Sequence, residues 1–143
     1  MSGTEPIVPR KPQLTSEQRE TLLNLAKAAL ARAYAPYSKF QVGAAVLTEA
    51  GAVYTGCNVE NSSYGLTNCA ERTAIFAAVA AEGPQMRIRA LAVWTNPEGP
   101  CSPCGACRQV IFELGPGAIV LFQGQEGVQE ICASELLPAG FRL

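Results

Sequence analysis

Two short stretches that carry cysteine, residues 68–72 (NCAER) and residues 102–108 (SPCGACR), constrain the fold of this chain most strongly. Together they offer three thiols and, two residues after the first thiol, the carboxylate of Glu71. Catalytic zinc sites generally use three protein ligands and keep a fourth position for water, whereas structural sites use four. The sequence therefore predicts a fold that brings the two stretches together around one zinc ion. The predicted zinc ligands are Cys69, Cys104 and Cys107.

Both stretches are expected at the beginning of a helix. Asn68 is a favoured N-cap residue, and a helix is predicted over residues 69–82. Ser102 followed by Pro103 predicts a second helix start, with an end near Leu114. The N-terminus of a helix carries unpaired N–H groups and a partial positive charge, which suits a site made of thiolates.

Two arginines are expected to reduce the negative charge that three thiolates place on the metal. Arg72 directly follows Glu71, and Arg108 directly follows Cys107. Groups that donate hydrogen bonds to metal ligands tune both the affinity and the reactivity of the metal. We therefore expect Arg72 and Arg108 to donate hydrogen bonds to sulfur.

The cysteine spacing also leaves other kinds of site open. A C-x-x-C pair occurs in structural zinc sites and in redox sites. Cys101 lies three residues before Cys104, and with Cys69 it would allow a structural site of four thiolates. We interpret Cys101 as a neighbour of the metal site rather than a ligand, and Cys57 and Cys132 as small, buried strand residues.

Helices alternate with apolar strands along the chain. Thr15 and Gln18 form a capping box, so a first helix is predicted to begin here and to end near Tyr34. A short helical turn is predicted over residues 134–137. Strands are predicted over residues 41–47, 53–58, 88–95, 118–123 and 128–132. This order indicates a layered α/β domain with a mixed sheet.

The length and composition of the chain fit one domain in a reducing compartment. The sequence of 143 residues predicts a flexible N-terminal arm over residues 1–13 and a single domain over residues 14–143. The first 13 residues have no signal-peptide character, and no apolar run is long enough to span a membrane. Six cysteines in such a chain favour a cytoplasmic location, where clustered cysteines more often bind metal.

Charge and the absence of histidine narrow the function further. The net charge is -1, and no tight basic cluster follows the first 40 residues, so a nucleic-acid partner is not expected. The chain has no histidine, which excludes a histidine base and a mixed Cys/His metal site. A small, uncharged substrate suits a chain with this near-neutral net charge.

Several segments, taken together, resemble the zinc-dependent cytidine deaminase family. Residues 69–71 (CAE) and 103–107 (PCGAC) are similar to its zinc signature. Residues 36–45 (PYSKFQVGAA), 56–61 (GCNVEN) and 136–141 (LLPAGF) resemble its small, free-nucleoside form. The resemblance covers residues 15–143. It implies a three-layer domain in which helices flank a mixed five-stranded sheet, with one Zn²⁺ per subunit.

The resemblance also implies a reaction, the hydrolytic deamination of cytidine and 2′-deoxycytidine to uridine and 2′-deoxyuridine in pyrimidine salvage. Glu71 would take a proton from the attacking water, deliver it to N3 and then protonate the leaving amine. The backbones of Ala70 and Cys104 would hold the base and the attacking oxygen. Arg72 would moderate the charge of the thiolates.

The same resemblance assigns the substrate-binding residues. Asn58 and Glu60 would bind the ribose hydroxyls, and Phe40 would lie along the base. The family's small form is a homotetramer with shared active sites, and Tyr64 and Phe141 would be supplied by a neighbouring subunit. Three alternatives remain open at this point: a deaminase of another aminated pyrimidine such as a blasticidin-type antibiotic, a nucleic-acid editing deaminase, and a structural zinc module with a binding role.

Overall fold

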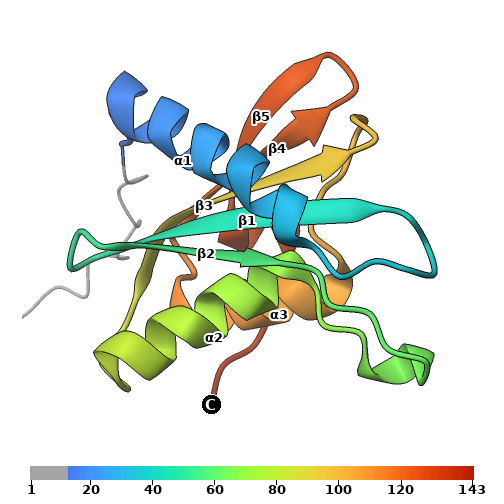
Figure 1. Ribbon diagram of the computed structural model, residues 1–143. Coiled ribbons are helices and arrows are strands. Elements are labelled where there is room, and N and C mark those ends of the chain that lie inside the picture. The colour runs from blue at the N-terminus through green and yellow to red at the C-terminus, as the bar shows by residue number, and fades with distance from the viewer. Residues whose placement is uncertain (1–12) are drawn as a thin grey trace, which may run out of the picture.

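The computed structural model describes residues 13–143, and the predicted arm therefore lies outside the described residues except for Gln13. A mixed sheet of five strands, in the order β2-β1-β3-β4-β5, forms the centre of the molecule (Figure 1). The strands are β1 (Gln41–Thr48), β2 (Val53–Cys57), β3 (Ile88–Asn96), β4 (Ile119–Gly124) and β5 (Gly127–Cys132). β3 and β4 are parallel, and the other neighbouring pairs are antiparallel. The predicted mixed five-stranded sheet is confirmed.

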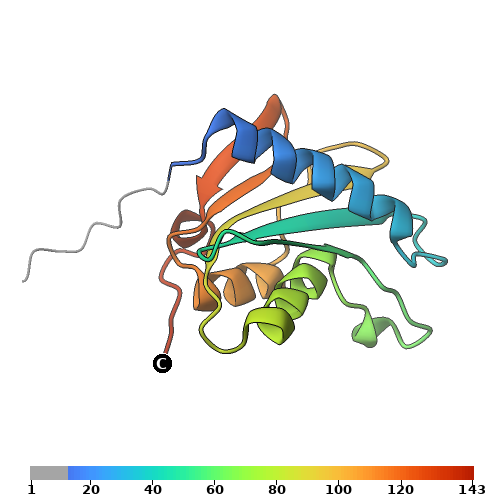
Figure 2. The ribbon, with the colours of Figure 1, turned by 60° about the vertical axis from the view of Figure 1, so that its left-hand side comes forward.

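Helices cover both faces of the sheet and complete three layers (Figure 2). The helices are α1 (Ser16–Ala29), α2 (Ala70–Glu82), α3 (Gly105–Leu114) and α4 (Ala133–Leu136), with 3₁₀ turns η1 (Leu30–Arg32) and η2 (Tyr64–Leu66). α1 packs on one face, where Leu22 and Ala26 meet Leu121 and Trp94. α2 and α3 pack on the other face, where Ile75 and Ile111 join the larger core cluster. The predicted capping box of α1 is present, with Thr15 and Gln18 joined by two hydrogen bonds of 3.0 Å.

Two features of the sheet position the beginnings of α2 and α3. The parallel step from β3 to β4 passes through α3, so the stretch with Cys104 follows the carboxyl end of β3. Gly56 of β2 lies against the first turn of α2, because a Cβ atom there would lie 2.7 Å from the carbonyl oxygen of Ala70. Glycine therefore allows α2 to approach the sheet closely.

α2 and α3 end at Glu82 and Leu114 as predicted, but they begin at different residues from those predicted. Cys69 is the N-cap of α2, because Asn68 pairs with Val59 through two backbone hydrogen bonds of 3.0 Å and stays extended. Cys104 is the N-cap of α3, and its Sγ accepts a hydrogen bond of 3.4 Å from the backbone N–H of Cys107.

The end of the first helix and the burial of two cysteines also differ from the predictions. α1 ends at Ala29 and is followed by η1, because the backbone N–H of Tyr34 donates instead to the carbonyl of Asn58. Cys57 and Cys132 are half-buried, because they lie at the ends of β2 and β5 rather than within a covered strand. Among residues 13–143, every helix is too short or too polar to cross a membrane.

Candidate active site

Three thiols from the two predicted stretches meet between the beginnings of α2 and α3. The Sγ atoms of Cys69, Cys104 and Cys107 all lie within 4.8 Å of one another. The Sγ atoms of Cys69 and Cys104 are 3.8 Å apart. Two sulfurs bound to tetrahedral zinc at about 2.3 Å are separated by about 3.8 Å. The three side chains therefore fit a zinc ion and could hold it.

The predicted hydrogen bond from Arg72 to sulfur is present. Its Nη2 donates to the Sγ of Cys69 over 3.2 Å. A hydrogen bond from the Cys107 thiol, together with the guanidinium of Arg72, lowers the pKa of Cys69 to about 5. The same bond to Cys69, followed by burial, raises the pKa of Cys107. Cys69 thus ionises more readily than Cys107, and Arg72 is placed to balance its charge.

The prediction for Arg108 is wrong. Its guanidinium donates to the carbonyl of Pro103 over 2.7 Å, to the carbonyl of Leu136 over 3.0 Å and to the Oγ of Ser102 over 3.0 Å. All three acceptors are oxygen atoms rather than sulfur atoms. Arg108 therefore ties the segment before α3 to α4, and Ser102 accepts from Arg108 while Cys104 caps the helix.

Glu71 is buried beside the three thiols. It is the second residue of α2, and its side chain is 5% exposed. Burial raises the pKa of its carboxyl, while its own backbone N–H and the Cys107 thiol form hydrogen bonds that act in the opposite direction. A buried carboxyl at this position can accept and return a proton close to a metal held by the thiols.

Cys101 lies near the site but outside the group of three thiols. Its backbone N–H donates to the carbonyl of Gln123 over 2.9 Å, which fixes the loop before α3 to the end of β4. Burial, followed by the nearby charges of Glu71 and Cys69, raises the pKa of the Cys101 thiol. This placement agrees with its interpretation as a neighbour of the metal site.

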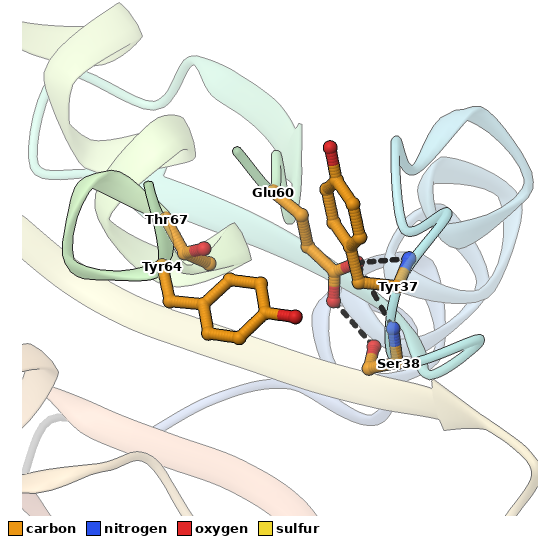
Figure 3. Close-up of a pocket in the computed structure, with 5 residues that line it drawn as sticks. All are labelled: Tyr37, Ser38, Glu60, Tyr64 and Thr67. Carbon is orange, nitrogen blue, oxygen red and sulfur yellow. Dashed lines mark hydrogen bonds between the residues drawn. The ribbon is translucent and has the colours of Figure 1, made fainter. Parts of the chain in front are cut away.

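Two of the predicted substrate-binding residues, Glu60 and Tyr64, line a cavity of about 310 Å³ (Figure 3). The lining residues are Tyr37, Ser38, Glu60, Tyr64 and Thr67. The carboxylate of Glu60 accepts hydrogen bonds from the backbone N–H of Tyr37 over 2.9 Å, from the backbone N–H of Ser38 over 3.1 Å and from the Ser38 hydroxyl. The hydroxyl of Ser38 is the main cause that lowers the pKa of Glu60. The cavity therefore presents an ionised carboxylate next to two aromatic rings.

Asn58 fixes the backbone around Phe40. Its Nδ2 donates to the carbonyl of Phe40 over 2.8 Å, and its Oδ1 accepts from the backbone N–H of Val42 over 2.8 Å. The side chain of Asn58 is 8% exposed. One amide hydrogen and one lone pair of Asn58 remain for a ligand.

The cavity and the thiols are joined through the backbone. The two hydrogen bonds between Val59 and Asn68 place the segment that carries Glu60 beside the residue that precedes Cys69. Ala70, the first residue of α2, is fully buried next to this bridge. The segment that carries Glu60 and the segment that carries Cys69 thus meet at the beginning of α2.

Two of the predicted substrate-binding residues, Tyr64 and Phe141, have largely exposed aromatic side chains. Tyr64, on η2, is 74% exposed, although its ring meets that of Tyr37 at a centroid distance of 5.8 Å. Phe141 is 68% exposed and lies in a separate groove along α3, where its carbonyl accepts from the Nε2 of Gln109 over 3.3 Å. Within one chain, the described residues therefore place Tyr64 at the cavity and Phe141 away from it.

Sequence reasoning gave no role to Ser38, Tyr37 or Thr67. Ser38 lies within the segment that carries the family resemblance, but its main partner is Glu60, 22 residues further along the chain. A local sequence pattern holds no signal for such a contact. The contact arises because the fold places the loop around Ser38 beside the segment after β2.

Comparisons with known proteins identify the family. A family model described as the cytidine and deoxycytidylate deaminase zinc-binding region matches residues 16–123. The chain is 51% identical over 124 residues to a cytidine deaminase of Sporosarcina psychrophila, covering 85% of this chain and 90% of that protein. It is also 51% identical over 125 residues to one of Halalkalibacterium halodurans, covering 86% and 93%.

Solved structures of similar proteins have the same fold. The crystal structure of cytidine deaminase from Burkholderia pseudomallei matches with a TM-score of 0.78 and 51% identity, covering 90% of this chain and 100% of that one. The structure of cytidine deaminase from Mycobacterium tuberculosis matches with a TM-score of 0.76 and 42% identity, covering 87% and 98%. Because the family model spans both helix beginnings that carry the three thiols, this chain belongs to the zinc-binding cytidine and deoxycytidylate deaminase family.

Proposed function

We propose that this enzyme hydrolyses cytidine and 2′-deoxycytidine to uridine and 2′-deoxyuridine, with release of ammonia, in pyrimidine salvage. The observation that carries the proposal is the buried carboxyl of Glu71 beside three thiols that fit a zinc ion. The names of the similar proteins, which are cytidine deaminases, support the choice of base.

The chemistry follows from the position of Glu71. A zinc ion held by the three thiolates supplies Lewis acidity that lowers the pKa of water toward about 7. Glu71 accepts a proton as the water oxygen adds to C4 of the base, and it gives this proton to N3. Glu71 then takes the remaining proton of the added oxygen and transfers it to the amine, and the C4–N4 bond breaks. The products are ammonia and a pyrimidine with a carbonyl group at C4.

The cavity around Glu60 suits a ribose. In the proposed complex, Glu60 and Asn58 bind the ribose hydroxyls and Phe40 lies along the base, while the backbones of Ala70 and Cys104 hold the base and the attacking oxygen. An ionised carboxylate accepts hydrogen bonds from hydroxyl groups and repels a phosphate. The expected substrate is therefore a free nucleoside rather than a nucleotide or a nucleic acid.

The proposed assembly is a homotetramer with one zinc ion per subunit and with shared active sites. Tyr64 and Phe141 would be supplied to the site by neighbouring subunits. The high exposure of Phe141, away from the cavity of its own chain, supports this role. Tyr64 lines the cavity of its own chain, and its 74% exposure leaves it open to a neighbour. We place the enzyme in the cytoplasm, in agreement with six free cysteines.

A substrate panel tests the proposed function directly. Ammonia release is measured with cytidine, 2′-deoxycytidine, cytidine 5′-monophosphate, a blasticidin-type antibiotic and a cytosine-containing oligonucleotide. We expect turnover of the two free nucleosides and at most weak turnover of the others. Turnover of the antibiotic or the oligonucleotide alone would replace the proposed function with the corresponding alternative.

Glu60→Gln is expected to raise KM for cytidine by roughly 10- to 100-fold, with a smaller change in kcat. The amide is a weaker acceptor than the carboxylate, and hydrogen bonds to charged groups are the stronger ones. Steady-state kinetics with cytidine measures the effect. Glu49→Gln, in the turn at the opposite end of β2, is the matched control and is expected to behave like the parent. An unchanged KM in Glu60→Gln would remove Glu60 from the ribose site.

Arg72→Ala is expected to weaken zinc binding by roughly 10- to 100-fold and to lower activity. The substitution removes the hydrogen bond to Cys69 and leaves the negative charge of the thiolates unbalanced. Zinc affinity is measured by competition with a chelator, and turnover is measured at saturating zinc. Arg87→Ala is the control, because Arg87 donates to the carbonyls of Pro84 and Met86, away from sulfur. Unchanged zinc affinity and turnover in Arg72→Ala would contradict the role of Arg72.

A further inference from the structure

Ser38 joins the carboxylate of Glu60 to the backbone of Phe40. Its backbone N–H and its hydroxyl both donate to Glu60, the first to Oε1 over 3.1 Å and the second to Oε2. The same hydroxyl oxygen accepts a hydrogen bond of 3.0 Å from the backbone N–H of Phe40. One small side chain therefore contacts Glu60, which we propose to bind the ribose, and the backbone of Phe40, which we propose to lie along the base.

The direction of these hydrogen bonds is set by their partners. The backbone N–H of Phe40 can only donate, so it uses a lone pair of the Ser38 oxygen and leaves the hydroxyl proton to point at Glu60. An ionised carboxylate can only accept, which agrees with this arrangement. Glu60 thus keeps its remaining lone pairs for donors that enter the cavity, and ribose hydroxyls are such donors.

The loop around Ser38 is built to hold this geometry. Lys39 has a φ of 60°, a left-handed conformation that is uncommon for a residue other than glycine. This turn brings the backbone N–H of Phe40 back to the hydroxyl of Ser38. Strained residues persist where surrounding interactions hold them, and here the holding group is Glu60 with its three hydrogen bonds from Tyr37 and Ser38 (Figure 3).

We propose that Ser38 is a positioning residue that orients Glu60 toward the ribose hydroxyls and thereby sets the affinity of the enzyme for ribose-bearing pyrimidines. This inference rests on the proposed function, because it needs Glu60 to bind ribose. Ser38 does not contact the reacting atoms, since the thiols and Glu71 belong to the beginnings of α2 and α3. Its loss therefore weakens nucleoside binding without slowing the chemical step.

The experiment compares the parent enzyme with Ser38→Ala, Ser38→Thr and Ser62→Ala. KM and kcat are measured with cytidine, and inhibition constants are measured for uridine and 2′,3′-dideoxyuridine. Dideoxyuridine has the same base as uridine but lacks the two hydroxyls that could donate hydrogen bonds to Glu60. Ser62→Ala is the matched control, because it removes a hydroxyl that lies 2.6 Å from the Oη of Tyr37 instead of contacting Glu60.

In Ser38→Ala, KM for cytidine and the inhibition constant of uridine are expected to rise by about three- to tenfold, the size of one lost hydrogen bond. The inhibition constant of 2′,3′-dideoxyuridine and kcat are expected to change less than about twofold. Ser38→Thr keeps the hydroxyl and is expected to restore the affinity for uridine. Ser62→Ala is expected to match the parent.

Three results would overturn the inference. Equal loss of affinity for uridine and dideoxyuridine would indicate general damage to the loop, and an unchanged KM would show that Ser38 does not position Glu60. A fall in kcat with KM unchanged would also contradict it. These outcomes differ from failure of the proposed function, in which the parent enzyme itself releases no ammonia from cytidine; the inference would then fall with it.

Discussion

Glu71→Gln is expected to lower kcat for cytidine by about 10²- to 10⁴-fold while the fold and the zinc content stay unchanged. Glutamine has nearly the same shape as glutamate and can fill the same buried position at the beginning of α2. Its amide cannot accept a proton from water or return one to N3 and to the leaving amine. The loss should therefore fall on the chemical step, with KM changed much less.

Three measurements distinguish this role of Glu71 from others. Ammonia release gives kcat, atomic absorption gives zinc per chain, and thermal unfolding checks the fold. Glu82→Gln is the matched control, because Glu82 ends the same helix and accepts a hydrogen bond of 2.8 Å from Thr48. Full activity in Glu71→Gln would remove Glu71 as the proton carrier. Loss of zinc with the activity would show that the carboxylate is a metal ligand instead.

Cys107→Ala is expected to lose zinc and deamination together. Cys107 is fully buried in the first turn of α3, so no other side chain can easily replace its thiolate. Two remaining thiolates bind zinc much more weakly than three, because each ligand lost also leaves a position that water must fill. Zinc content is therefore expected to fall well below one per chain after dialysis, and ammonia release to fall to the background of the assay.

The neighbouring thiol provides the control for this loss. Cys101→Ala is expected to keep both zinc and activity, because Cys101 lies outside the group of three thiols. If Cys101→Ala lost zinc as completely as Cys107→Ala, the site would hold four thiolates and its role would be structural. Full zinc content and activity in Cys107→Ala would remove Cys107 from the ligand set.

Much of the fold was predictable from the sequence because its signals are local. The capping box at Thr15 and the alternation of apolar strands with helices indicated the elements, and both cysteine stretches indicated where helices begin. The exact N-caps of α2 and α3 were not predictable. Asn68 forms two backbone hydrogen bonds with Val59, and the hydroxyl of Ser102 accepts a hydrogen bond from Arg108. Both interactions depend on the tertiary structure.

The metal site was more predictable than the substrate cavity. Three thiols and Arg72 lie within two short stretches, so their meeting follows once the two helix beginnings converge. The predicted hydrogen bond from Arg108 to sulfur was wrong, because one of its partners, the carbonyl of Leu136, lies 28 residues further along the chain. Ser38 was missed for the same reason, since nothing in the sequence around it shows that it would face Glu60.

The most direct test of the account is zinc K-edge X-ray absorption of the enzyme as prepared, together with zinc content per chain. We expect one zinc ion per chain, with three sulfur ligands at about 2.3 Å and one lighter ligand, oxygen from water, at about 2.0 Å. Addition of a nucleoside inhibitor should leave the three sulfurs unchanged. Four sulfur ligands, or no zinc in enzyme prepared with the metal present, would contradict it.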